Sequence, residues 1–484
     1  MMKRNFYHIL GIDSLSGSER IRDAYKEAVI RFHPDINHSP GSGEEFLSIQ
    51  QAFEVLNDPI KKIEYDAQIE SDAELFPVTV ILKSSQKTIP PSQESQLLYC
   101  LFDVNCNVQP EQTVNSPMAI ALVVDTSTSM AGDRLDSVKR CLLALIQQLN
   151  KDDYFCVIGF NDRAQVVVPL VQAEKFRPEE EQITRMATTG GTELYQGLHT
   201  AYSCLMAKEA DHCRMHMVIF TDGNTYGDEA DCLRLAKNAA EKKVVISAFG
   251  FGNEWNDVFL DRLTAITGGE TRFVAKSNNL EQYFQIKLSS LGTLFSQSVK
   301  LSFSHRKDVK VNYAFRLKPD AAPIEIADEM VLGNVPFKGK LTVILELILP
   351  VMDMTQKNLR LGQGFVTIES PFWDSQIRSF FNYKIDISTQ ERDERPIAEI
   401  ANALAVLTMY RIQDRARQDV ADGKSDLAVA KLDYLIKHLK GLGHFAFAQE
   451  VEKERESIVR IGKYSNSGDK TIKYGTRALL LPEN

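Results

Sequence analysis

The sequence has no apolar run long enough to cross a membrane. None of its windows approaches the ~18 consecutive apolar residues that a membrane-spanning helix needs. The basic start at residues 1–10 is followed by too short an apolar stretch for a secretory signal. We therefore expect a cytoplasmic protein without a membrane span.

Cysteine is also scarce. The chain of 484 residues has seven cysteines, an odd number, and no C-x-x-C pair. Most of them lie in apolar patterns, where a free cysteine behaves as a small hydrophobic residue. This usage argues against a disulfide framework and fits a reducing compartment.

The charge balance lacks the excess of basic residues that is typical of nucleic-acid-binding proteins. The formal net charge of -9 at pH 7 gives no overall attraction to nucleic acid or to an anionic membrane. Hydrophobic residues make up 44% of the chain and charged residues 25%, as in ordinary globular proteins. At about 150 residues per domain, the length predicts roughly three domains, each able to bury its own core.

An apolar run at residues 119–124, with no polar alternation, is typical of a strand covered on both faces in a parallel sheet. Asp125, Ser127 and Ser129 follow directly, so they would lie at the carboxyl end of that strand, where α/β sheets bind ligands. One acid and two hydroxyls at alternating positions can direct several oxygens at one point. Hard divalent cations prefer such an oxygen-only shell.

Two later stretches extend this set: Gly190-Gly191-Thr192, and an apolar run at residues 218–220 that leads into Thr221 and Asp222. Together the three stretches resemble the von Willebrand factor A domain and its metal-ion-dependent adhesion site, a D-x-S-x-S motif with a distant Thr and a distant Asp. All five expected positions are filled here, by Asp125, Ser127, Ser129, Thr192 and Asp222.

The resemblance implies a divalent metal ion, with Mg²⁺ expected first and Mn²⁺ or Ca²⁺ as alternatives. It implies that Ser127, Ser129 and Thr192 contact the ion through hydroxyls, while Asp125 and Asp222 bind directly or through water. A sixth position would be left for a carboxylate of a protein partner. The alternative is that each residue only caps a helix or forms a turn, a common role of Asp, Ser and Thr.

Strand and helix patterns alternate from about residue 117 to 297, which predicts a doubly wound α/β domain. Apolar positions between 135 and 149 mark its first helix. Residues 155–160, 244–249 and 271–274 are predicted to be further strands. A dinucleotide-binding fold would need G-x-G-x-x-G after the first strand, and the sequence has no such turn there.

The region before this domain has a helical pattern. Residues 18–32 form an amphipathic helix that must stop near His33, because Pro34 disfavours helical geometry at the residue before it. A second helix follows, and a third is expected to start at Asp58-Pro59. With His33-Pro34-Asp35 in the loop between the first two helices, residues 5–70 are similar to a J-domain, the module by which DnaJ-type co-chaperones engage DnaK-type chaperones.

The J-domain resemblance implies that His33, Pro34 and Asp35 promote ATP hydrolysis by a DnaK-type partner. Three cations of the preceding helix would face the acidic surface of that partner: Arg22, Lys26 and Arg31. Two acids dilute the basic face of this helix, and no Gly/Phe-rich linker or cysteine-rich zinc module follows. The alternative is a helical hairpin that is retained only for packing.

Strand patterns near residues 78–82 and 97–102 have no crossover helix between them, so they need partners from later strands in an antiparallel sandwich. The predicted segments are a J-domain at 1–70, sandwich strands at 71–116, the inserted A domain at 117–297, the rest of the sandwich at 298–390, a helical hairpin or bundle at 391–460 and an extended tail at 461–484. This order resembles bacterial proteins named calcium-activated chloride channel-like. That name carries no weight for transport, because no segment spans a membrane.

Three function classes follow. The first is a non-catalytic co-chaperone or adaptor, which recruits a DnaK-type chaperone and holds an unknown protein ligand through its metal. The second is a scaffold with an inert J-domain in a larger assembly, such as one around a MoxR-type AAA+ ATPase. The third is a metal-dependent hydrolase, which needs a base near the metal. His199 is the only histidine near the motifs, and a structural role fits it better.

Overall fold

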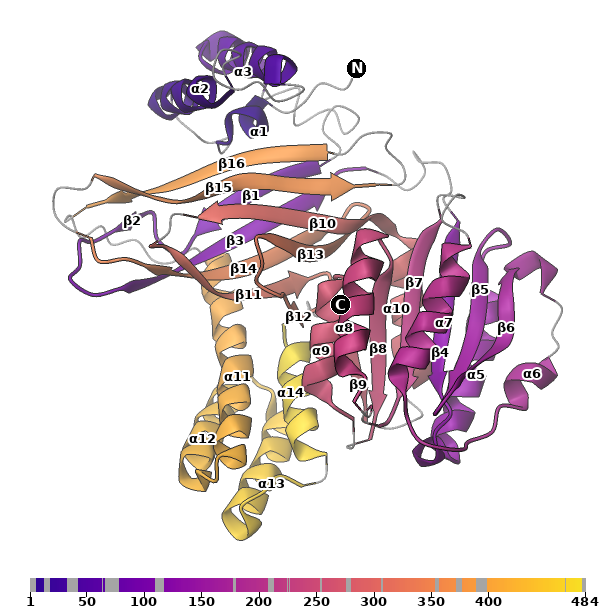
Figure 1. Ribbon diagram of the computed structural model, residues 1–484. Coiled ribbons are helices and arrows are strands. Elements are labelled where there is room, and N and C mark those ends of the chain that lie inside the picture. The colour runs from indigo at the N-terminus through magenta and orange to yellow at the C-terminus, as the bar shows by residue number, and fades with distance from the viewer. Residues whose placement is uncertain are drawn as a thin grey trace. The chain divides into compact units, whose positions relative to one another are not determined.

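The computed structural model describes residues 6–12, 18–32, 42–62, 64–65, 78–108, 117–176, 180–207, 213–223, 225, 227–252, 255–275, 280–305, 308–352, 357–370, 377–388, 398–465 and 467–480 (Figure 1). The chain divides into two compact units. The first contains Met1–Val114, Thr293–Pro319 and Ile324–Ile400, and the second contains Asn115–Gly292, Asp320–Pro323 and Ala401–Asn484.

The second unit is built on a six-stranded sheet with the order β6-β5-β4-β7-β8-β9. The strands are β4 (Met118–Asp125), β5 (Tyr154–Phe160), β6 (Ala164–Gln172), β7 (Arg214–Thr221), β8 (Val245–Phe251) and β9 (Thr271–Val274). All pairs are parallel except β5 with β6. Every residue of β4, β7 and β8 is buried, which explains why these strands show no polar alternation. The predicted doubly wound α/β fold is confirmed. β6 was not predicted: it is a partly exposed edge strand, and Pro169 interrupts its apolar run.

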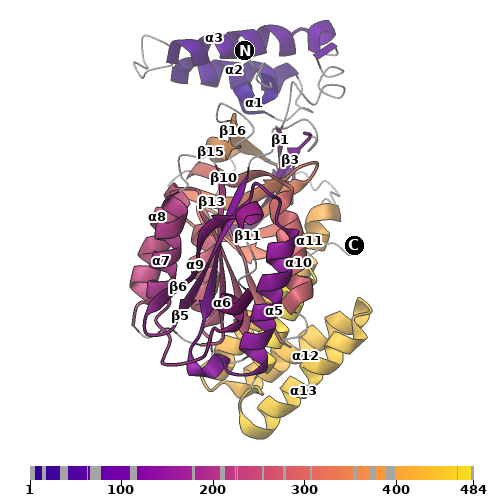
Figure 2. The same ribbon diagram turned by 90° about the vertical axis from the view of Figure 1, so that its right-hand side faces the viewer.

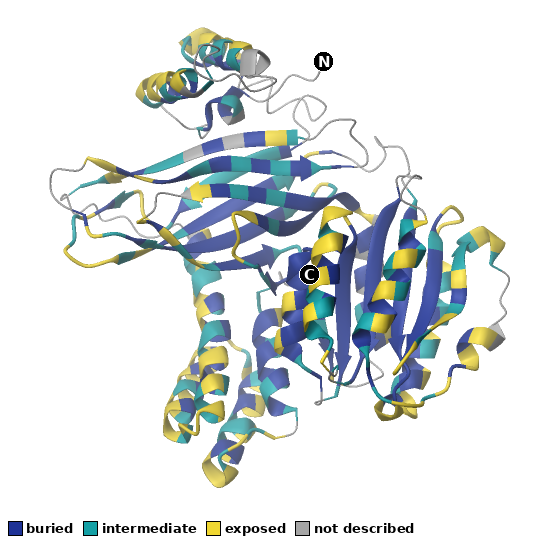
Figure 3. Ribbon diagram, viewed as in Figure 1, coloured by how far each residue is buried: buried dark blue, intermediate teal, exposed yellow. Residues whose placement is uncertain are grey.

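Helices cover both faces of this sheet (Figure 2). On one side lie α5 (Asp133–Gln148) and α10 (Leu280–Gly292), and on the other α7 (Leu194–Met206), α8 (Glu229–Glu241) and α9 (Asp257–Ile266). Short helices are η2 (Thr128–Met130), η3 (Ala173–Lys175) and α6 (Glu180–Thr184). The central strands are buried, whereas the helices turn exposed residues outward (Figure 3). In α5 the buried side chains Leu135, Val138, Leu142 and Leu145 recur at helical spacing, as predicted.

The first unit contains two five-stranded sheets, with the orders β1-β3-β14-β11-β12 and β13-β10-β15-β16-β2. Apolar side chains of both sheets form one core; for example, Phe102 of β3 lies edge-on to Phe303 of β10, with ring centroids 6.5 Å apart. The predicted sandwich, with early strands paired to later ones, is therefore present. The strands are β1 (Val78–Ser84), β2 (Thr88–Ile89), β3 (Gln96–Cys106), β10 (Leu294–His305), β11 (Lys310–Lys318), β12 (Ala322–Pro323), β13 (Glu329–Pro336), β14 (Lys340–Leu349), β15 (Asn358–Glu369) and β16 (Ile377–Ile387).

The N-terminal helices are α1 (Phe6–Leu10), α2 (Ser18–Phe32) and α3 (Ser42–Leu56). α2 and α3 pack through an aromatic pair, Tyr25 and Phe53, whose stacked rings have centroids 4.0 Å apart. Residues 59–62 and 64–65 are also helical. Asp58 caps this turn, since its Oδ1 accepts hydrogen bonds from the amides of Ile60 (2.9 Å) and Lys61 (3.2 Å). The two long helices, and the start of the third helix at Asp58, lie where the sequence predicted them.

Four helices form the C-terminal region: α11 (Ala398–Ala421), α12 (Ser425–Gly441), α13 (Phe445–Ile461) and α14 (Gly468–Ala478). The predicted extended tail at 461–484 is wrong for residues 468–478, which form α14. Charged residues such as Lys473 and Arg477 are usually exposed, but both are buried here. A helix at this place satisfies them with charged partners.

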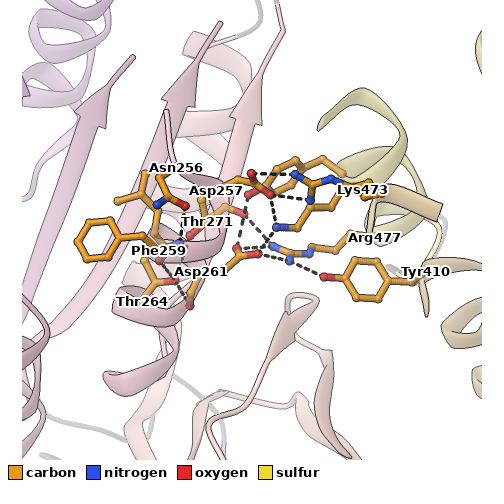
Figure 4. Close-up of polar contacts among 12 residues, drawn as sticks. Asn256, Asp257, Phe259, Asp261, Thr264, Thr271, Tyr410, Lys473 and Arg477 are labelled. Atoms are coloured by element: carbon orange, nitrogen blue, oxygen red, sulfur yellow. Dashed lines mark hydrogen bonds and ion pairs between the residues drawn. The ribbon is translucent and has the colours of Figure 1, made fainter. Parts of the chain in front are cut away.

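Those partners belong to α9, and all contacts lie within the second unit (Figure 4). Arg477 donates to both carboxylate oxygens of Asp261, at 2.9 and 2.7 Å, and to the hydroxyl of Tyr410 at 3.0 Å. The Lys473 ammonium pairs with Asp261 at 2.7 Å and also with Asp257. Arg417 of α11 donates to both oxygens of Asp257, at 2.9 and 3.0 Å. These two acids and three bases are named the α9–α14 ion cluster.

The cluster keeps its carboxylates ionised. Burial opposes the charge on Asp257, but the hydrogen bonds from Arg417 and the charge of Lys473 outweigh it and hold the pKa of Asp257 well below its usual range. The pKa of Asp261 is lowered in the same way by Arg477 and Lys473, again against burial. The stabilisation from these acids is therefore present above the ordinary carboxyl pKa, near 4, and is lost as the pH falls through the folded pKa.

We predict that Arg477→Met lowers the free energy of unfolding of the second unit by about 3–5 kcal/mol at pH 7, because it leaves Asp261 buried without its bidentate partner. Urea unfolding followed by tryptophan fluorescence measures this, since Trp255 packs beside Tyr474 of α14 with ring centroids 5.8 Å apart. The loss should shrink below about pH 4. Arg460→Met, at an exposed position of α13, is the control. An equal effect from both variants would contradict the prediction.

Candidate metal centre

The pairing of β4 with β7 brings two acidic side chains together. The strands are parallel neighbours, with Val124 opposite Phe220, so both end at the same edge of the sheet. Asp125 is the last residue of β4 and Asp222 directly follows β7. Both side chains are buried. The carboxyl ends of the two central strands therefore bring together two carboxylates that are 97 positions apart in the chain.

Asp125 is held by hydrogen bonds from both strand ends. Its Oδ1 accepts from the amide of Ser127 at 2.8 Å, and its Oδ2 accepts from the Thr221 hydroxyl at 2.6 Å. Burial raises the pKa of Asp125 to about 6, against the lowering effect of these hydrogen bonds. A buried acid whose charge is only partly compensated is suited to a cation.

The two serines continue this network. Ser127 Oγ and Ser129 Oγ lie 3.0 Å apart, and the Ser129 hydroxyl donates to Asp222 Oδ1 at 2.7 Å. Ser129 lies in η2, which follows β4. Four of the five predicted residues thus form one hydrogen-bonded chain, from Asp125 through the two serines to Asp222.

Thr192, the fifth predicted residue, reaches the same place from another loop. It is buried, and a Cβ added to Gly223 would lie 3.1 Å from its hydroxyl oxygen, so this hydroxyl faces the backbone next to Asp222. Gly190 and Gly191, which precede Thr192, lie close against Asp162. Gly190 has φ +71°, and a Cβ there would lie 2.3 Å from Asp162 Oδ2. The carbonyl of Gly190 accepts a 3.0 Å hydrogen bond from the Thr128 hydroxyl, which ties this loop to the serine loop.

The donor set fits a hard divalent cation. Two carboxylates and three hydroxyls offer oxygen alone, as Mg²⁺, Mn²⁺ and Ca²⁺ prefer. Among the residues that the structure describes, no group of three or more His, Cys, Asp and Glu side chains could hold a metal. The hydroxyls are therefore what distinguishes this site from an isolated acidic pair.

Two further residues of the site were not predicted. Thr221 holds Asp125, and Arg134 of α5 pairs its Nη1 with Asp222 Oδ2 and donates to the carbonyl of Ser129 at 3.2 Å. In the sequence, Thr221 is recognisable only as the end of a strand. The one sequence signal for Arg134 is its place in the first turn of the helix after the serine loop.

The predicted chaperone-binding residues are only partly described. His33, Pro34 and Asp35 lie outside the described residues, as does the side chain of Arg31. Arg22 and Lys26 are exposed on α2. Arg22 Nε donates to Asn57 Oδ1 at 3.1 Å, and Lys26 lies 3.6 Å from Asp23 of the same helix.

Three family models match the chain. The von Willebrand factor type A domain matches residues 119–286, the DnaJ domain matches residues 5–66, and the Sll0103-like C-terminal alpha-helical domain matches residues 398–482. Domains of the first kind commonly bind a divalent metal ion. In the described residues, no helix combines the length and the apolar character needed to cross a membrane.

The relatives match separate parts of the chain. The uncharacterized protein sll0103 from Synechocystis is 32% identical over 36% of this chain and 43% of its own length. The chaperone protein DnaJ from Lactobacillus gasseri is 39% identical over 14% of this chain and 17% of its own length. The chain thus spans less than half of either relative. The name calcium-activated chloride channel-like stays a prediction.

Two solved structures share the fold. A von Willebrand factor type A protein from Catenulispora acidiphila has a TM-score of 0.66 at 15% identity, covering 82% of this chain and 96% of its own. The ArnB paralog VWA2 from Sulfolobus acidocaldarius has a TM-score of 0.54 at 13% identity, covering 84% and 98%. At this identity they show the architecture alone.

We predict that Thr221→Val destabilises the protein by about 1–3 kcal/mol at pH 7, because Asp125 Oδ2 stays buried without its hydrogen bond. Valine keeps the shape of threonine, so packing changes little. Chemical unfolding in the absence of added metal measures the loss. The same substitution at Thr79, on the half-buried strand β1, is the control and should change stability by less than about 0.5 kcal/mol. Equal stability of the Thr221 variant and wild type would contradict this role.

Proposed function

Because this chain joins a DnaJ domain, a von Willebrand factor type A domain and an Sll0103-like C-terminal helical domain, we propose that it is a non-catalytic adaptor of a DnaK-type chaperone. Its A domain holds a protein ligand through a divalent metal, and its J-domain brings the chaperone to that ligand. The observation that carries the proposal is the hydrogen-bonded oxygen cluster at the end of β4 and β7, in a chain that also carries a DnaJ domain.

In the metal half of the proposal, Ser127, Ser129 and Thr192 would bind Mg²⁺, or Mn²⁺ or Ca²⁺, through their hydroxyls. Asp125 and Asp222 would supply the charge. A metal held by these residues would supply a Lewis acid to which a carboxylate of the ligand could bind. Ser129 and Asp222 are already joined at 2.7 Å, so these residues are positioned by the protein before any ligand arrives.

In the chaperone half, α2 presents Arg22 and Lys26 to solvent, which supports an electrostatic contact with an acidic chaperone surface. His33, Pro34 and Asp35 are proposed to stimulate ATP hydrolysis by that chaperone. The sequence has no Gly/Phe-rich linker or cysteine-rich zinc module for clients. An A domain on the same chain would supply this missing function and raise the effective concentration of its ligand near the chaperone.

An adaptor is preferred to a hydrolase because His199, the one histidine near the motifs, is an exposed residue of α7. Its ring lies 5.7 Å from that of Tyr195, in a helix surface pair. This contact does not make His199 a base for the two carboxylates. Affinity capture on the wild type and on Asp125→Ala separates the adaptor from a scaffold. An adaptor should retain DnaK on both proteins and lose other proteins only from the variant. If neither protein retains DnaK, the scaffold is favoured.

We predict that millimolar Mg²⁺ raises the stability of the wild type by RT ln(1 + [L]/Kd), about 2.7 kcal/mol at a hundredfold excess over Kd. Asp125→Ala and Asp222→Ala should each abolish the gain, because each removes a charge from the oxygen cluster. Thermal unfolding with EDTA and with Mg²⁺, Mn²⁺ or Ca²⁺ measures it. Asp136→Ala, at an exposed position of α5, should keep the full gain. A melting temperature indifferent to all three ions would contradict the metal site.

We predict that the protein accelerates single-turnover ATP hydrolysis by a DnaK chaperone, and that His33→Gln abolishes the acceleration without a change in melting temperature. His438→Gln, at an exposed position of α12, is the matched control and should stimulate like the wild type. Asp125→Ala should also stimulate fully, because it changes only the other half of the adaptor. Equal rates with the wild type and the His33 variant would reject the J-domain activity.

A further inference from the structure

Arg134 occupies a defined position at the proposed metal site. It is the second residue of α5, which begins directly after Gly132, whose φ is +78°. The Arg134 guanidinium pairs with Asp222 Oδ2 and donates to the carbonyl of Ser129 at 3.2 Å. The Asp222 side chain has no exposed surface, whereas that of Arg134 is 36% exposed. The guanidinium therefore reaches from the surface onto a buried carboxylate.

The backbone of a third strand end makes room for this side chain. Gly252 directly follows β8 with φ +62°, and a Cβ there would lie 2.7 Å from Arg134 Nη2. Any other residue at this position would push the guanidinium aside as well as strain the backbone. The place of Arg134 is thus bounded by Asp222 on one side and by Gly252 on the other.

The ion pair limits what Asp222 offers to a metal. Its Oδ2 is taken by Arg134 and its Oδ1 accepts from the Ser129 hydroxyl at 2.7 Å. A serine hydroxyl can turn its proton away and still coordinate a cation, but a guanidinium has no lone pair to offer. A metal that binds Asp222 through both oxygens therefore competes with the guanidinium for Oδ2, whereas a metal that binds through Oδ1 alone does not. Both oxygens of Asp125 also accept hydrogen bonds, from Ser127 and Thr221.

We infer that Arg134 is an internal counter-ion of Asp222 that weakens divalent-metal binding and disfavours Ca²⁺ relative to Mg²⁺. The inference rests on the metal site proposed above. A divalent ion at this site either leaves the guanidinium on Asp222, where two cations repel each other, or displaces it and breaks the ion pair. Both routes weaken binding.

The ion preference follows from coordination chemistry. Ca²⁺ takes six to eight oxygens, often with a bidentate carboxylate, whereas Mg²⁺ takes six single oxygens in an octahedron and keeps several waters. A bidentate contact with Asp222 competes with Arg134 for Oδ2, but a monodentate contact through Oδ1 does not. The cost of the ion pair therefore falls more heavily on Ca²⁺ than on Mg²⁺.

Isothermal titration calorimetry of the full chain with Mg²⁺ alone and with Ca²⁺ alone tests this inference. Arg134→Gln should bind both ions about fivefold or more tightly, within the usual range of coupling between two sites, with the larger gain for Ca²⁺. Arg134→Lys keeps the positive charge but not the planar guanidinium, so its metal affinities should lie between those of the wild type and the Gln variant. Arg140→Gln, the same charge change at an exposed position of α5, should match the wild type.

Each outcome decides. Wild-type binding of Mg²⁺ with unchanged or weaker affinities in Arg134→Gln overturns the inference and leaves the metal site standing. Equal gains for the two ions overturn the ion preference. Binding to neither ion by wild type or variants overturns the metal site, and the inference with it. Should Arg134→Gln fail to fold, as judged by circular dichroism and the melting temperature, Arg134→Lys against Arg140→Gln decides by the same criteria.

Discussion

A hydrogen bond of 2.6 Å between the Thr221 hydroxyl and Asp125 Oδ2 joins the ends of the two central strands, and the candidate site depends on it. It forms only because β4 and β7 are parallel neighbours in a register that sets Val124 beside Phe220. The same register brings Asp222 within reach of the serine loop. Because both strands are wholly buried, neither can slip without moving apolar side chains into water. The core of the sheet thus fixes the geometry of its polar edge.

The buried strands of the sheet and the first three oxygen donors could be predicted from the sequence on physical grounds, since an apolar run without alternation and a following acid with two hydroxyls are both local patterns. Thr192 and Asp222 needed the family resemblance, because no local rule says which distant threonine or aspartate completes a shell. Arg134 could not be found in this way: its partner lies 88 residues away, and only the folded chain shows that Gly252 leaves it room. The helix α14 was missed for a related reason, since buried cations look solvent-exposed in sequence.

Buried carboxylates face basic side chains at two places in the second unit, but the negative charge is neutralised to a different extent at each. In the α9–α14 ion cluster, each of the two acids pairs with two bases, which suits a permanent contact between helices. At the strand ends, one partly exposed arginine pairs with Asp222, while Asp125 accepts hydrogen bonds from the uncharged Ser127 amide and Thr221 hydroxyl. This second balance leaves negative charge uncompensated, and it is the kind of site that an external cation can enter.

The position of the cluster's cations along the chain has a consequence for biosynthesis. Asp257 precedes Lys473, and Asp261 precedes Arg477, by 216 residues each. At roughly 5–20 residues per second, the ribosome needs about 10–40 s to deliver these partners. Arg417 follows Asp257 by 160 residues, so the carboxylates of α9 acquire their charged partners only after α11 and then α14 have been synthesised. Until then, the side of α9 that carries Asp257 and Asp261 keeps its negative charge without the bases that neutralise it in the folded unit.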